Sequence, residues 1–135
     1  MKYFTFNELT FSPTAKRKNI DNTPDSTVKA KLTALVANIL DPLREAYGKP
    51  IVVTSGYRCP KLNKAVGGVP KSQHLKGEAA DIRTLSDKPS DNKKLFDLII
   101  KLNLPFDQLI DEYGYNWIHV SYSQSLNRKQ VLHIK

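Results

Sequence analysis

The longest regular pattern of hydrophobic positions lies in residues 25–47. Apolar residues recur there every three or four positions, which is the period of an α-helix with one buried face. Asp25 or Ser26 suits the N-terminal cap, and Gly48 suits the end of the helix. Because proline lacks a backbone N–H donor, we expect Pro42 to kink or divide this helix.

A second helical pattern covers residues 90–103, where Ser90 or Asp91 is the expected cap. Shorter apolar runs bounded by glycine, proline or polar residues are typical of strands. We predict strands at residues 51–54, 79–83, 106–110, 117–122 and, at an edge of the sheet, 130–134. Residues 113–116, which include a glycine, predict a hairpin turn between the third and fourth strands.

Residues 1–24 have no regular period, and we expect an irregular arm that packs its aromatic side chains on the rest of the chain. Residues 59–70 contain two adjacent glycines and are expected to form a loop or a short helix. A chain of 135 residues is about one domain, so we expect a single domain over residues 1–135. The predicted fold class is α+β, with a small, mainly antiparallel sheet and packed helices.

The composition is that of an ordinary soluble protein, with 40% hydrophobic and 25% charged residues. The net charge of +8 favours anionic partners, but no nucleic-acid-binding motif accompanies it, so we expect no nucleic-acid partner. The single cysteine, Cys59, excludes a disulfide within the chain and a zinc site built on several thiolates. No segment is typical of a signal peptide or a membrane span, so we expect a protein that is cytoplasmic as synthesised.

The candidate chemistry lies in residues 72–82 and in the predicted fourth strand. His74 and Asp81 belong to the first stretch and His119 to the strand. A catalytic zinc ion typically takes three protein ligands, and imidazole and carboxylate groups suit it. Taken singly, a histidine or an aspartate more often has a structural role, and we assign such a role to the third histidine, His133.

Five short segments form a pattern that extends over nearly the whole chain. They are Ser55-Gly56-Tyr57-Arg58, Asn63 with Val66-Gly67-Gly68, Ser72-Gln73-His74-x-x-Gly77-x-Ala79-x-Asp81, Phe106-Asp107-Gln108-Leu109-Ile110-x-Glu112 and Trp117-Ile118-His119-Val120-Ser121. This pattern resembles the zinc D-Ala-D-Ala carboxypeptidase and L-alanyl-D-glutamate endopeptidase family, which has the hedgehog/DD-peptidase fold. The opening, Phe4-Thr5-x-x-Glu8-Leu9, is similar to the small single-domain branch found in phages and prophages.

The resemblance implies three zinc ligands: His74, Asp81 and His119. It also implies that Arg58 lies beside the metal. A guanidinium group there would bind a substrate carboxylate or stabilise the oxyanion of a tetrahedral intermediate. Ser72 and Gln73 are expected at the rim of the cleft, where they would hydrogen-bond the peptide.

Peptide hydrolysis by such a site also needs a general base. Many members of the wider family have an acidic residue three positions before the last histidine, but this chain has Asn116 there. The resemblance implies that Glu112 is the base, because it matches the glutamate of the Phe-Asp-Gln-Leu-Ile-x-Glu segment in the small branch, and a hairpin would bring it back toward the metal. The alternative is a glutamate with no more than a turn role. Asp111 is adjacent but would point to the opposite face of the strand.

The resemblance implies a monomeric zinc (Zn²⁺) peptidase that hydrolyses D-Ala-D-Ala or L-Ala-D-Glu bonds in peptidoglycan stem peptides. A phage or prophage lysin, released onto the wall by a separate factor, would fit the expected location. Asn116 leaves open the alternative of a zinc-bearing but catalytically weak or inactive wall-binding or phage structural module. A basic nucleic-acid-binding domain is a further alternative, supported by charge alone.

Overall fold

The first long helical pattern folds as three consecutive helical segments in the computed structural model, which describes residues 1–135. These are α3 (Ser26–Leu35), the π-helical segment η1 (Val36–Leu40) and α4 (Asp41–Tyr47). The Asp25 carboxylate caps α3 by accepting a hydrogen bond from the backbone N–H of Val28 at 2.8 Å. Pro42 is the second residue of α4, which continues from η1 without a break, since Leu40 and Asp41 both have right-handed helical φ and ψ. The helical backbone is therefore not divided at Pro42, and the change from α to π turns lies directly before the proline.

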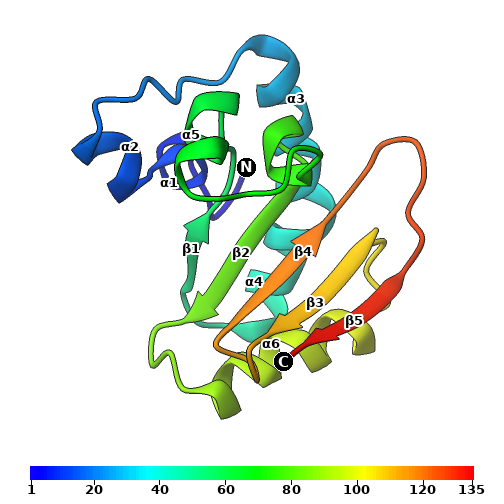
Figure 1. Ribbon diagram of the computed structural model, residues 1–135. Coiled ribbons are helices and arrows are strands. Elements are labelled where there is room, and N and C mark those ends of the chain that lie inside the picture. Colours follow the sequence, from blue (N-terminus) through cyan, green and yellow to red (C-terminus); the bar gives the residue numbers. More distant parts are fainter.

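Five strands form one sheet with the order β1-β2-β4-β3-β5 (Figure 1). They are β1 (Ile51–Ser55), β2 (Ala79–Thr84), β3 (Gln108–Glu112), β4 (Trp117–Ser121) and β5 (Gln130–Ile134). All neighbours are antiparallel except β3 and β5, which pair in parallel. The predicted α+β class is confirmed. The third strand runs two residues later than the predicted range, so Glu112 is part of it.

The strand register separates the sheet into two faces. Asp81 pairs with His119 across β2 and β4, and Glu112 pairs with Trp117 across β3 and β4. Because side chains alternate along a strand, these four residues share one face. The other face is apolar and buried, with Ile82, Ile118 and Val120 in the core.

Helix α6 (Pro89–Lys101) covers the apolar face, as Figure 1 shows behind β3 and β4. It buries Leu95, Phe96 and Ile99. The predicted cap at Ser90 or Asp91 is wrong, because α6 begins at Pro89 and has no side-chain cap. Proline suits the first helical position, and the Asp91 carboxylate accepts a hydrogen bond from Ser86 instead.

The N-terminal arm is not irregular, which corrects the sequence-based expectation. It contains the short helices α1 (Phe6–Thr10) and α2 (Pro13–Arg17). Thr5 caps α1 and Ser12 caps α2 through their hydroxyl groups. Phe4 and Leu9 lie in the hydrophobic core, whereas Phe11 is exposed. None of the helices of the fold is long and apolar enough to span a lipid bilayer.

Gly56 joins this arm to the sheet at the end of β1. The backbone N–H of the next residue, Tyr57, donates to the Leu9 carbonyl at 2.8 Å. A Cβ atom on Gly56 would lie 2.1 Å from the same carbonyl oxygen, which is a severe clash with backbone. Replacement of Gly56 with alanine should therefore lower the free energy of unfolding by about 3 kcal/mol, the upper end of the range for overpacking.

Denaturant unfolding of Gly56→Ala beside the wild type would measure this loss. Gly114→Ala is the matched control, because a Cβ on Gly114 would meet no atom within 4 Å, although its positive φ adds a small cost. Equal stability of Gly56→Ala and wild type would contradict the close packing of the arm on β1.

Candidate metal centre

Three elements bring the candidate ligands together. His74 lies in the short 3₁₀ helix η2 (Gln73–Lys76), Asp81 in β2 and His119 in β4. The Ser72 hydroxyl caps η2 by accepting from the backbone N–H of His74 at 3.2 Å. The backbone N–H of Arg58 donates to the His74 carbonyl at 3.0 Å. Both backbone groups of His74, its N–H and its carbonyl, therefore have hydrogen-bond partners, which fix the position of the residue.

The three side chains form one cluster on the open face of the sheet. Asp81 Oδ1 lies 3.3 Å from His74 Nε2 and 3.0 Å from His119 Nδ1. One ligand atom from each residue lies within 4.8 Å of the other two. Two ligands of one tetrahedral zinc ion are about 3.3 Å apart, because zinc bonds to nitrogen and oxygen are about 2.0–2.2 Å long. The spacing of the cluster fits such an ion.

The hydrogen bonding of His74 shows why a cation suits this position. His74 Nδ1 lies 2.7 Å from the Gly56 carbonyl oxygen, which can only accept, so the ring proton is on Nδ1. Nε2 of the neutral ring then presents a lone pair to the Asp81 carboxylate. Two acceptors at 3.3 Å repel each other, and a shared positive charge, either a proton or a metal ion, removes the repulsion.

The Asp81 carboxylate is mostly buried and is the negative centre of the cluster. Burial by itself would raise its pKa, but hydrogen bonds to His119 and His74 and the positive charge of a proton shared with them outweigh burial and hold the pKa well below its ordinary value. No lysine or arginine forms an ion pair with Asp81. The donor set, two imidazoles and a carboxylate that stays ionised, therefore fits a divalent metal ion such as zinc.

Arg58 is linked to this cluster through the Ser72 hydroxyl and the backbone of His74. Its Nη2 donates to the Ser72 hydroxyl at 3.2 Å, and its buried Nε has no hydrogen-bond partner. Burial lowers the pKa of Arg58, and the charges of Asp81 and Glu112 oppose this effect. Apart from the bond from Nη2, the guanidinium group forms no hydrogen bond within the protein, and the charges of Asp81 and Glu112 act on it.

Ser72 and Gln73 both have partners within the protein. Ser72 is buried, and its hydroxyl joins Arg58 to the backbone of His74. Gln73 donates to Asp107 at 2.8 Å. The sequence-based prediction named these two residues as peptide-binding, and the structure adds that they position neighbouring groups. Asp107 had no assigned role, although it belongs to the Phe-Asp-Gln segment of the motif pattern.

Glu112 lies on the same face as the cluster, and its environment is unusual for a carboxylate. Burial and the charge of Asp81 raise its pKa above the ordinary value. Trp117 Nε1 donates a hydrogen bond to Glu112 Oε2 at 2.6 Å, which opposes this rise. Asn116 lies in the exposed turn after β3. The half-buried carboxylate close to the metal cluster is thus Glu112.

The hydrogen bond from Trp117 gives a testable pH dependence. A carboxylate acts as a base only when it is deprotonated, so activity should fall as the pH drops through the pKa of Glu112. Trp117→Phe removes a bond that stabilises the charged form, so the pKa should rise further. The acidic limb of the kcat profile should then move to higher pH by up to about one unit.

The control for this measurement is Trp117→Phe combined with Glu112→Gln. This double variant has no Glu112 carboxylate. The pH profile of its remaining kcat should therefore show no acidic limb from the titration of Glu112. An acidic limb at the same pH in wild type and Trp117→Phe would show that Glu112 is not the group that titrates.

Comparison with known protein families agrees with this geometry. A sequence model of the family described as Peptidase M15 matches residues 2–121. The chain belongs to the peptidase M15 family. The three clustered residues, Arg58 and Glu112 all lie inside the part that matches, whereas β5 lies outside it. No curated protein matches the chain. Membership in the peptidase M15 family makes this protein a peptidase, and the histidine–aspartate–histidine cluster is its candidate metal site.

Proposed function

We propose that this protein is a zinc peptidase that hydrolyses peptide bonds in peptidoglycan stem peptides. The observation that carries the proposal is the cluster of His74, Asp81 and His119 in a chain of the peptidase M15 family. A zinc ion held by these three residues would supply a Lewis acid that polarises the scissile carbonyl and makes water a better nucleophile. The remaining chemistry belongs to the side chains around the cluster.

Glu112 has the properties required of the general base. Its raised pKa is closer to neutrality than that of an ordinary glutamate, which suits both removal and return of a proton. In the proposed reaction the carboxylate takes a proton from the attacking water and passes it to the departing amine. The bond from Trp117 fixes the other carboxylate oxygen, so one oxygen stays available for the proton.

Arg58 supplies positive charge on the substrate side of the site. The guanidinium group would bind the oxygen that becomes negative in the tetrahedral intermediate or a carboxylate of the substrate. Stem peptides contain both kinds of group. Ser72 holds the guanidinium in place through its buried hydroxyl, so it acts as a positioning residue.

The substrate class rests on the motif pattern. The segments around Arg58, His74 and His119 resemble those of enzymes that cleave D-Ala-D-Ala or L-Ala-D-Glu bonds. Peptidoglycan is anionic, and the net charge of +8 is favourable for approach to it. We also propose that the protein is a lysin of phage or prophage type, on the similarity of its opening segment to the small single-domain branch.

Digestion of purified peptidoglycan, with the products identified by mass spectrometry, tests the proposal. Loss of a terminal D-alanine would identify a carboxypeptidase, and release of stem peptides that begin with D-glutamate would identify an endopeptidase. The absence of any new amino terminus or free D-alanine, with the metal bound, would contradict the proposed function.

A second candidate function follows from Asn116. Catalysis would be absent if the base had to be at position 116, because the amide of Asn116 cannot take up a proton. The protein would then bind a metal ion and the cell wall without cleaving a peptide bond. Binding to intact walls without any product would favour this module over the peptidase. The half-buried position of Glu112 supports the peptidase.

A further inference from the structure

The positive charge of this protein is concentrated in two segments. Residues 9–20 and 56–77 contain eight of the 21 lysines and arginines and none of the 13 acidic residues. The remaining 13 basic residues therefore balance the 13 acidic residues, and the two segments account for the whole net charge of +8. Acidic residues flank the segments at Glu8, Asp21 and Glu78, so the excess of positive charge belongs to these two stretches of the chain.

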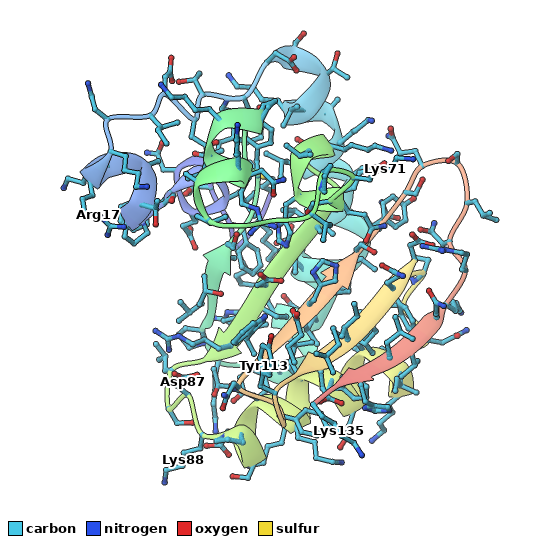
Figure 2. The ribbon with its side chains drawn as sticks, viewed as in Figure 1. Arg17, Lys71, Asp87, Lys88, Tyr113 and Lys135 are labelled. Carbon is cyan, nitrogen blue, oxygen red and sulfur yellow. The ribbon has the colours of Figure 1, made fainter.

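The fold brings the two segments to one end of the molecule. Helix α2 packs against α5 (Pro60–Ala65), and the Tyr57 N–H bonds to the Leu9 carbonyl. The side chain of Asn22 bridges the arm to the second segment through the Tyr57 carbonyl and the Cys59 N–H. Figure 2 shows Arg17 and Lys71 at this end, away from Asp87, Lys88 and Lys135.

Seven of the eight cations are exposed and free of ion pairs. They are Lys16, Arg17, Lys18, Lys61, Lys64, Lys71 and Lys76, and we call them the cationic end. Outside the two segments, four basic residues pair with carboxylates: Lys2, Lys93, Lys94 and Arg128. The eighth cation, Arg58, lies in the metal centre, so the cationic end continues to the rim of the candidate site.

We propose that the cationic end binds a linear phosphodiester polyanion of the polyol-phosphate type, as a wall polymer that lies beside the peptide substrate. This inference rests on the proposed function for the location of the partner. Six of the seven side chains are lysines, which act as point charges and suit phosphates on a flexible chain. A bound polymer would hold the metal centre near the stem peptides of the same wall.

Nucleic acid is the other partner with a phosphodiester backbone, and the surface suits it less well. Proteins that bind single strands stack bases on several aromatic side chains, but the only exposed aromatic residue of the two segments is Phe11. Helices α2 and α5 have five and six residues, which is short for a helix that reads a groove. The two segments therefore have the positive charge that binds phosphates but not the side chains or helices that contact bases.

The test measures binding of the full chain to poly(glycerol phosphate), which has no peptide bond, over a series of salt concentrations. The variant Arg17→Gln/Lys61→Gln/Lys64→Gln removes three charges from the cationic end. The control, Lys88→Gln/Lys101→Gln/Lys135→Gln, removes three exposed charges outside the two segments. Both variants have the same net charge, so only the position of the charges differs.

We expect the first variant to bind the polymer at least tenfold more weakly, with a log–log salt slope shallower by about two. The control should stay within about twofold of wild type, and both should cleave soluble stem peptides as wild type does. Equal weakening of the two variants would overturn the proposal. Tighter binding to single-stranded DNA with the same number of phosphates would overturn it too. Polymer binding does not require peptide hydrolysis. The binding measurement therefore tests the cationic end even if the protein shows no peptidase activity.

Discussion

Replacing His119 with alanine should reduce peptide hydrolysis by at least about 10³-fold, or about 4 kcal/mol of transition-state stabilisation. The substitution removes one of three ligand atoms that lie within 4.8 Å of one another. It also leaves the buried Asp81 carboxylate with a single imidazole partner. The measurements are cleavage of stem peptides and the zinc content of the purified protein, which should fall together.

His133→Ala is the matched control, because His133 is the other strand histidine that contacts an aspartate. Its partner, Asp111, points to the opposite face of the sheet, so His133 is outside the cluster. This variant should keep both its zinc and its activity, with at most a small loss of stability. Normal zinc content and normal cleavage in His119→Ala would exclude the proposed metal centre.

Replacing Glu112 with glutamine should lower kcat by about 10²–10⁴-fold, the usual contribution of a general base. The amide keeps the size of the side chain and can still accept the hydrogen bond from Trp117, but it cannot take up a proton. Zinc content should not change, because Glu112 is not one of the three clustered residues. The combination of bound zinc and lost turnover distinguishes a base from a ligand.

Asn116→Ala tests the alternative position and should leave kcat within about twofold of wild type. The side chain of Asn116 is exposed and forms no hydrogen bond, since only its backbone groups have partners. A large loss of kcat in Asn116→Ala, with none in Glu112→Gln, would move the catalytic function to the turn.

The grouping of His74, Asp81 and His119 is implied by the resemblance of the motif pattern, and local sequence patterns account for the face that each strand residue occupies. The alternation of apolar residues in β4 fixes which side of the strand His119 occupies, and the same holds for Asp81 in β2. The π turns of η1 could not be predicted, because helical periodicity is nearly the same for the two kinds of helix. The sequence analysis missed the short helix α1, although Thr5 and Glu8 have the spacing of a capping box and the Glu8 N–H donates to the Thr5 hydroxyl.

Contacts between distant segments could not be predicted from the sequence. The bond between His74 Nδ1 and the Gly56 carbonyl joins residues 18 positions apart, and the bond between Gln73 and Asp107 joins residues 34 positions apart. Neither has a periodic signature. The same is true of the parallel pairing of β5 with β3, since the hydrophobic pattern of a strand does not specify its neighbour.

The direct pairing of Asp81 with His119 across β2 and β4 has a consequence for how the site acquires an ion. The sheet sets the spacing of these two groups, and a shift of one residue would move His119 into the core in place of Ile118 or Val120. The entropic cost of bringing Asp81 and His119 together is therefore part of the free energy of folding and not of ion binding. The coordination energy of a bound ion would then be available as affinity, and binding would need no change in the register of the sheet.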